Sequence, residues 1–141
     1  MAKPDFSGIW RLDPARSKLS SPPVTRLLMK IAHEEPRFTQ TIRADLPDGR
    51  VQISTFSGVS GGGEFVNQTP NGAWHSAATW EGDSLLIESF VTLGARRFHF
   101  RDHWYRSADA LVMQHRGGDL AGQIAWLESA PQLAGEFDAA P

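Results

Sequence analysis

The feature of this sequence that most constrains its fold is a succession of short segments in which apolar and polar residues alternate, each ended by a turn signal. Pro47-Asp48-Gly49 and Glu81-Gly82-Asp83 are typical of these turns, because glycine tolerates the positive φ angles that tight hairpins need. Helical periodicity is hard to find. The alternation predicts strands at residues 5–12, 24–33, 37–45, 50–57, 63–69, 74–80, 84–92, 96–106, 110–116 and 121–128.

About ten strands joined by hairpin-length loops indicate an antiparallel meander. A twisted sheet of this many strands tends to curl and close, because closure removes its exposed edges. We therefore predict an all-β fold in which residues 1–128 form one domain, an up-and-down antiparallel β-barrel. The segment 129–141 is rich in small residues and contains prolines, so we expect it to be a loosely attached C-terminal tail.

Composition excludes several classes of function. The 14 basic and 16 acidic residues are scattered and give a net charge of -2, so no basic stripe is available to bind nucleic acid. Cysteine is absent, which removes disulfides and thiolate metal sites. No apolar run approaches the roughly 20 residues of a membrane helix, and no signal-peptide pattern is visible. We expect no membrane insertion and a cytoplasmic location for the chain as given, or a periplasmic or secreted one for a longer precursor.

The first predicted strand carries the motif Phe6-Ser7-Gly8-Ile9-Trp10. It resembles the Gly-x-Trp signature of the calycins, the superfamily of lipocalins and fatty-acid-binding proteins. The resemblance implies that Trp10 plugs the closed end of a barrel and that Gly8 allows a sharp bend of the strand. The segments 6–13 and 102–104 also resemble a large set of uncharacterised bacterial lipocalin-like proteins.

Departures from the family pattern limit what this resemblance implies. The segment 13–23 is too short for the two-helix lid of fatty-acid-binding proteins. The last predicted strand, at 122–128, lacks the Arg-x-Tyr pair with which those proteins grip a carboxylate. The lipocalin arginine that packs across the Gly-x-Trp tryptophan has no obvious counterpart after Arg116. The resemblance therefore implies a barrel without a two-helix lid, and not the family's usual mode of fatty-acid binding.

Strand alternation also predicts which side chains point into the barrel, because residues i and i+2 share a face. The inward sets are mostly aliphatic and aromatic with an occasional polar residue, which suits a ligand cavity and equally an ordinary core. We predict an apolar wall formed by Met29, Phe38, Phe100, Trp104 and Trp126, with polar anchors at Gln40, Asn67, Asp102 and His115.

Two of these anchors are also candidate catalytic residues. Alternation places Asp102 among apolar inward side chains, where a carboxylate needs hydrogen bonds or a cationic partner. His115 shares a face with Leu111 and Met113 and is the best candidate for a proton donor. It is also a candidate haem ligand, since the related nitrobindins bind haem through one histidine, although their glycine pattern after Gly-x-Trp is missing here. A structural role satisfied by protein partners is the alternative for both.

No metal site and no cofactor are expected. His99 and His103 look like a metal pair, but four residues of a strand span about 13 Å, too far for one ion to bridge. The leading function is the binding of a small apolar or amphipathic molecule inside the barrel. Two alternatives stay open: a cofactor-independent isomerase or cyclase, and a structural module with a filled barrel. We expect a monomer or a homodimer, the latter through an outer face with Leu28 or Tyr105.

Overall fold

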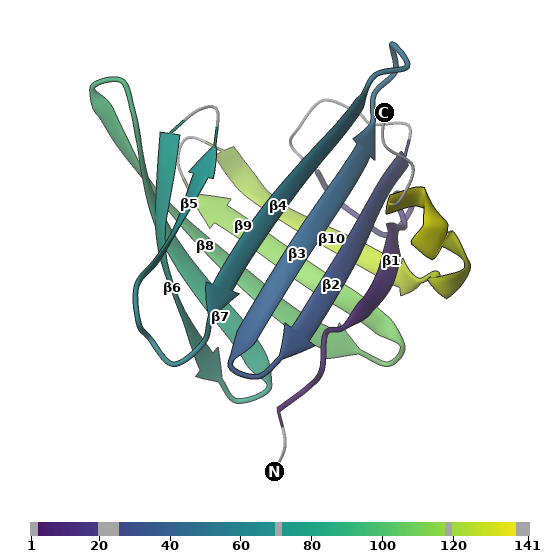
Figure 1. Cartoon of the computed structure of the whole chain (residues 1–141), viewed down its shortest axis with the longest axis horizontal. Coiled ribbons are helices and arrows are strands. Elements are labelled where there is room, and N and C mark those ends of the chain that lie inside the picture. Colours follow the sequence, from purple (N-terminus) through teal and green to yellow (C-terminus); the bar gives the residue numbers. More distant parts are fainter. Residues whose placement is uncertain (1–2, 20–25, 70–71, 118–119, 138–141) are drawn as a thin grey trace.

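The computed structural model describes residues 3–19, 26–69, 72–117 and 120–137. It contains ten antiparallel strands and one short helix (Figure 1). The elements are β1 (Gly8–Leu12), β2 (Arg26–Glu34), β3 (Arg37–Asp45), β4 (Val51–Val59), β5 (Phe65–Thr69), β6 (Gly72–Glu81), β7 (Ser84–Leu93), β8 (Arg96–Ser107), β9 (Ala110–Gly117), β10 (Leu120–Ser129) and the 3₁₀ helix η1 (Pro131–Phe137). The predicted all-β fold is confirmed, and each predicted strand overlaps one observed strand.

The strands form one sheet that curls into a nearly closed barrel. Their order is β4-β3-β2-β1-β10-β9-β8-β7-β6-β5. Strands that are consecutive in the sequence pair with each other, except β4 and β5, and β1 also pairs with β10. The first and last strands therefore join the two halves of the chain. The sheet's two edge strands, β4 and β5, lie next to each other without forming a ladder of backbone hydrogen bonds, and this is where the barrel stays open (Figure 1).

The side-chain amide of Asn67 bridges these two edges. Its Oδ1 accepts a hydrogen bond from the backbone N–H of Ser57 at 3.0 Å, and its Nδ2 donates to the Ser57 carbonyl at 2.9 Å. The amide thus takes the place of a backbone peptide unit, satisfying a donor and an acceptor at an edge where strand pairing has stopped. This contact helps to close the barrel.

Trp10 packs at the end of the barrel that holds the N-terminal segment. Its side chain is buried, and its Nε1 donates to the carbonyl of Phe6 at 3.0 Å. Gly8 has a φ of +147°, and a Cβ at this position would lie 3.4 Å from Trp10 Nε1. The ring folds back over Gly8, so this position combines a backbone conformation that favours glycine with a close approach. The guanidinium of Arg106 lies 5.1 Å from the centre of the Trp10 ring.

Arg106 changes one expectation drawn from the sequence. The sequence offers no arginine after Arg116 to pack across Trp10. In the structure this role is taken by Arg106, which lies earlier in the chain, in β8. Its Nη1 also donates to the carbonyl of Asp5 at 3.2 Å. The contact joins β8 to the N-terminal segment, two parts of the chain that are not paired as strands.

A polar cluster built around Glu35 seals the same end. The His33 ring accepts the backbone N–H of Phe6 through Nδ1 at 3.2 Å and lies 3.2 Å from Glu35 Oε1 through Nε2. Ser60 Oγ and Trp80 Nε1 both donate to Glu35 Oε2 at 2.8 Å. Burial raises the pKa of Glu35, but these hydrogen bonds from Ser60, Trp80 and His33 outweigh it, and the pKa lies below its ordinary value.

Part of the segment predicted to be a loosely attached tail contacts the barrel in the structure. The carboxylate of Glu136 in η1 lies 3.0 Å from Arg26 Nη1, and the Glu136 carbonyl accepts a hydrogen bond from Arg43 Nη1 at 2.6 Å. Leu28 lies on the same outer face of β2 as Arg26 and is fully buried. A homodimer face built on Leu28 is therefore wrong, because this side chain is already covered.

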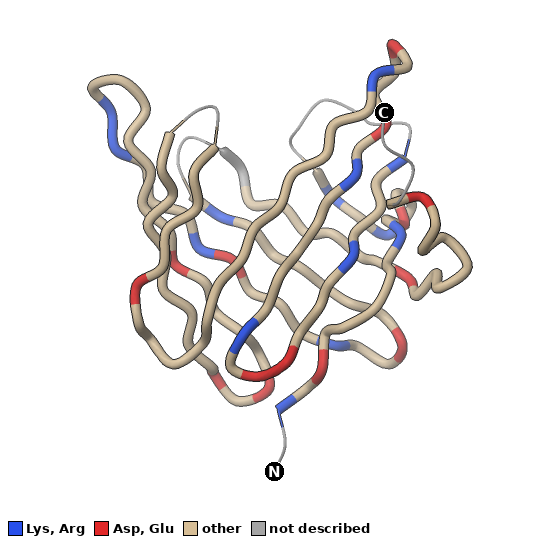
Figure 2. Tube along the Cα trace, viewed as in Figure 1, with Lys and Arg blue, Asp and Glu red and all other residues tan. Residues whose placement is uncertain are grey.

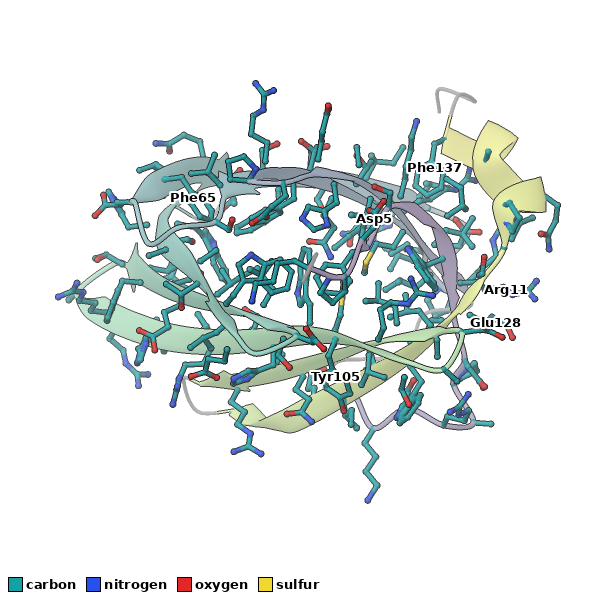
Figure 3. The ribbon with its side chains drawn as sticks, turned by 90° about the horizontal axis from the view of Figure 1, so that it is seen from below. Asp5, Arg11, Phe65, Tyr105, Glu128 and Phe137 are labelled. Carbon is teal, nitrogen blue, oxygen red and sulfur yellow. The ribbon has the colours of Figure 1, made fainter. Side chains whose placement is uncertain are left out.

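The interior divides into a packed end and a hollow end, and side chains from both halves of the sheet point into the space between them (Figure 3). The packed end is a cluster of buried apolar side chains: Phe6, Trp10, Met29, Ile31, Phe38, Ala78, Leu85, Ile87, Trp104, Leu111 and Leu127.

Charged residues are interspersed along the strands and turns (Figure 2). Within the described part of the chain, no helix has the length and apolar character needed to cross a membrane.

Candidate functional site: the barrel cavity

A cavity of about 350 Å³ lies inside the barrel beside the packed cluster. It reaches the surface near Leu19 and Thr55, which are both exposed and both line it. The lining comes from both halves of the sheet and consists of Leu19, Met29, Gln40, Ile42, Ser54, Thr55, Phe56, Asn67, Thr69, Trp74, Ile87, Ser89, Asp102, Trp104, Met113, His115, Gln123 and Ala125. The volume falls in the range of roughly 300–1,000 Å³ that is typical of small-molecule sites.

The structure brings six of the nine predicted binding residues to this cavity. They are Met29, Gln40, Asn67, Asp102, Trp104 and His115. They come from β2, β3, β5, β8 and β9, and strand alternation turns each of them inward. Asn67 also carries the bridge between β4 and β5, so much of its hydrogen-bonding capacity is already used.

Two predicted wall residues pack beside the cavity instead of lining it. Phe38 is buried in the packed end, with its ring centre 5.5 Å from Trp104 and 5.9 Å from Phe65 in edge-on contacts. Phe100 lies in a stack of rings, 5.1 Å from Trp74 and 5.2 Å from His115. Both side chains support lining residues, which is a packing role.

Trp126 lies on the outside of the barrel, so the prediction that it forms part of the cavity wall is wrong. Its neighbour Ala125 lines the cavity, so alternation turns Trp126 to the opposite face of β10. There the guanidinium of Arg16 lies 4.1 Å from the centre of the Trp126 ring. The indole is covered by the segment after β1, which explains how a large aromatic side chain is accommodated outside.

Sequence reasoning missed several lining residues. Ile42 and Met113 belong to the inward faces that alternation predicts for β3 and β9, so the signal for them was present. Phe56 and Trp74 also line the cavity. Phe56 lies on β4, an edge strand with mostly exposed residues, where burial does not alternate cleanly. Trp74 lies on the same face of β6 as the buried Ser76 and Ala78, so alternation within that strand carried the signal for it.

Asp102 and His115 form a hydrogen-bonded pair on the cavity wall. They are direct partners in the register of β8 and β9, and His115 Nδ1 lies 2.6 Å from Asp102 Oδ1. Both side chains are about a quarter exposed. The hydrogen bond to Asp102 is the main reason that the pKa of His115 is raised above its ordinary value of 6.5, and burial opposes it. The pair fixes the ring orientation and leaves Nε2 as the nitrogen that a ligand would meet.

Gln40 is a buried polar residue of the cavity wall whose side-chain amide has only weak hydrogen-bond partners among the described residues. It is 7% exposed, and its Nε2 lies 3.0 Å from the sulfur of Met29 and 3.8 Å from that of Met113. Thioether sulfur is a weak hydrogen-bond acceptor. The amide therefore keeps most of its capacity to bind an oxygen atom.

The remaining buried polar pair is satisfied internally. The hydroxyls of Ser76 and Ser89 lie 2.8 Å apart and are both buried, and Ser89 lines the cavity. The outward histidines of β8 lie beside glutamates: His103 is 3.3 Å from Glu81, and His99 is 3.9 Å from Glu88. Among the residues described, no group of three or more histidine, aspartate or glutamate side chains is placed to hold a metal ion.

No protein-family model and no curated protein matches this sequence. Solved structures do match its fold. An SAHS protein from Ramazzottius varieornatus is 19% identical with a TM-score of 0.65, over 92% of this chain and 98% of its own. Human cRBP IV is 18% identical with a TM-score of 0.65, over 91% of this chain and 100% of its own. The REP1-NXSQ fatty acid transporter is 11% identical with a TM-score of 0.65, over 89% of this chain and 96% of its own. These similarities show that the chain shares the β-barrel fold of these three proteins.

Proposed function

We propose that this protein binds a small, mainly apolar molecule inside its barrel. The observation that carries the proposal is the cavity of about 350 Å³, whose wall combines aliphatic, thioether and aromatic side chains with a few polar groups. Burial of apolar ligand surface would supply most of the affinity, at roughly 25 cal/mol per Å². The polar groups would set the orientation of the ligand.

The comparisons support this class of function at the level of the fold. One structural neighbour is described as a fatty acid transporter, and another is cRBP IV. A ligand in the present chain would occupy the cavity inside its barrel. The finer likeness to bacterial lipocalin-like proteins rests on the segments 6–13 and 102–104 and stays a prediction, as does the choice between monomer and homodimer.

Tryptophan fluorescence tests the proposal because Trp74 and Trp104 line the cavity. Titration with N-phenyl-1-naphthylamine, an uncharged apolar fluorophore, should give saturable energy transfer from tryptophan and a probe emission shifted to the blue. Long-chain alcohols should displace the probe competitively. Failure of the probe and of a panel of apolar competitors to give any saturable signal would contradict the proposal.

A second candidate function is acid–base catalysis, which the Asp102–His115 pair favours. A carboxylate that holds one imidazole nitrogen leaves the other free to take or give a proton, as an isomerase or cyclase requires. Exchange of the α-protons of an apolar ketone with solvent deuterium, followed by NMR, tests this chemistry. Catalysed exchange that is lost in Asp102→Asn, with ketone binding retained, would establish it. Exchange at the uncatalysed rate would leave binding as the function.

A further inference from the structure

We propose that the cavity selects neutral amphipathic molecules, with an alcohol, aldehyde or ketone as the polar end, and discriminates against carboxylates. We further propose that the polar end enters first and is bound by Gln40. This inference rests on the proposed binding function and specifies its ligand class. The charge of the cavity wall supports the discrimination, and the position of the Gln40 amide supports the orientation.

The cavity wall offers no surplus positive charge. No lysine or arginine is among the described residues that line it, and its ionisable groups are Asp102 and His115. This pair carries a net charge of zero when His115 is protonated and of -1 when it is neutral, provided that Asp102 is ionised. The internal segments outside the described residues, 20–25, 70–71 and 118–119, contain no lysine or arginine in their sequence. A carboxylate ligand would therefore lose its hydration without gaining an unpaired cation.

A neutral oxygen atom, in contrast, finds a donor in Gln40. The Gln40 Nε2 has thioether sulfurs as its neighbours, at 3.0 Å and 3.8 Å, and the side chain is more than nine-tenths buried. A buried amide N–H with weak acceptors gains free energy when an oxygen acceptor replaces them. Because the Gln40 amide is uncharged, a neutral ligand oxygen can replace the sulfur acceptors without leaving an unbalanced charge in the cavity.

The position of Gln40 gives the ligand an orientation. Gln40 is in β3 and Met113 is in β9, on strands that are far apart in the sheet, so the contact between them crosses the barrel. The amide therefore lies across the floor of the cavity, above the packed cluster that includes Met29 and Trp104.

The rest of the wall continues from this floor toward the opening. Ile42 and His115 lie two residues farther along β3 and β9 than Gln40 and Met113, which is about 7 Å nearer the open end. A polar head at Gln40 would have His115 Nε2 within the next layer of side chains. The apolar body would extend past Ile42 and Trp74 toward Leu19.

Two ligands with the same chain test the charge argument. Dodecan-1-ol and dodecanoate differ in their polar end, and dodecanoate is ionised at about pH 7.5. Displacement of N-phenyl-1-naphthylamine should give a Kd for the alcohol at least tenfold below that for the carboxylate. An equal or tighter Kd for dodecanoate would overturn the inference while leaving the proposed function intact. Absence of binding by the probe and both ligands would contradict the proposed function itself.

Three variants test the residues. Gln40→Leu should weaken dodecan-1-ol about tenfold and leave the Kd of the apolar probe within about twofold, since one hydrogen bond is lost. Gln68→Leu, the same change at an exposed position of β5 that is not among the cavity-lining residues, is the matched control and should change neither Kd. Ser54→Arg adds a cation to the wall and should tighten dodecanoate about tenfold. An equal loss of alcohol and probe binding in Gln40→Leu would show that Gln40 acts by packing alone.

Discussion

His115 and Asp102 occupy directly opposed positions of β9 and β8, and their side chains meet at 2.6 Å on the wall of the cavity. The contact depends on strand register, since a shift by one residue would turn one of the two side chains to the outer face. The Asp102–His115 hydrogen bond therefore forms only when β8 and β9 keep this register.

The pH dependence of this pair is a first prediction. The pKa of His115 is raised above 6.5 by Asp102, so the pair stabilises the fold fully below about pH 6.5, and this contribution is lost as the pH rises through the folded pKa. Asp102→Asn should lower the free energy of unfolding by on the order of 1 kcal/mol at about pH 6 and by less at about pH 9. NMR titration of the His115 ring should show its pKa falling in the variant. A loss of stability that is equal at both pH values would contradict this account.

A second prediction concerns Gly8, whose φ is +147°. Gly8→Ala places a side chain in a conformation that L-residues rarely adopt and should lower the free energy of unfolding by about 1–3 kcal/mol. Gly63→Ala is the control, because a Cβ there meets nothing within 4 Å, and it should be close to neutral. Urea denaturation of both variants measures the difference. Similar stability of the two would mean that the bend at Gly8 is not required.

A third prediction concerns the bridge between the sheet edges. Asn67→Ala removes both hydrogen bonds to the backbone of Ser57 and should lower stability by about 1–2 kcal/mol. The Ser57 amide should then exchange with solvent deuterium faster than in the parent protein. Gln68→Ala, at an exposed neighbouring position of β5, should leave that exchange rate unchanged. Unchanged Ser57 protection in Asn67→Ala would refute the bridging role.

The contact between η1 and the barrel gives a fourth prediction. Glu136→Gln weakens the ion pairs with Arg26 and Arg43 and should lower stability by about 0.5–1 kcal/mol at low salt. The effect should shrink in about 1 M salt, because screening already weakens the pairs in the parent protein. Glu34→Gln, at an exposed position of β2, is the control. A Glu136→Gln effect that does not depend on salt would argue against an ionic contact.

The fold was predictable because its signals are local. Each hairpin has its own turn residues, and each strand has its own alternation, so all ten strands follow from short stretches of sequence. The inward faces of β2, β3 and β8 follow in the same way, which is how Met29, Gln40 and Asp102 were identified.

The errors arise where a side chain is placed by a distant part of the chain. Trp126 is predicted as a wall residue, but it packs on the outside of the barrel, where Arg16 from the segment after β1 covers its ring. Arg106 covers Trp10 from a strand that does not pair with β1. The Asp102–His115 contact needs the register between two strands, which alternation within either strand does not provide.

The most direct test of the central claim is to fill the cavity and measure ligand binding. Ala125 lines the cavity, whereas Ala32 is an exposed residue of β2, so Ala125→Trp and Ala32→Trp add the same side chain inside and outside the barrel. Isothermal titration with dodecan-1-ol should show that Ala125→Trp loses binding by at least about tenfold while Ala32→Trp matches the parent protein. Folding of both variants is checked by circular dichroism. Undiminished binding by a folded Ala125→Trp protein would contradict the claim that the ligand site is the barrel interior.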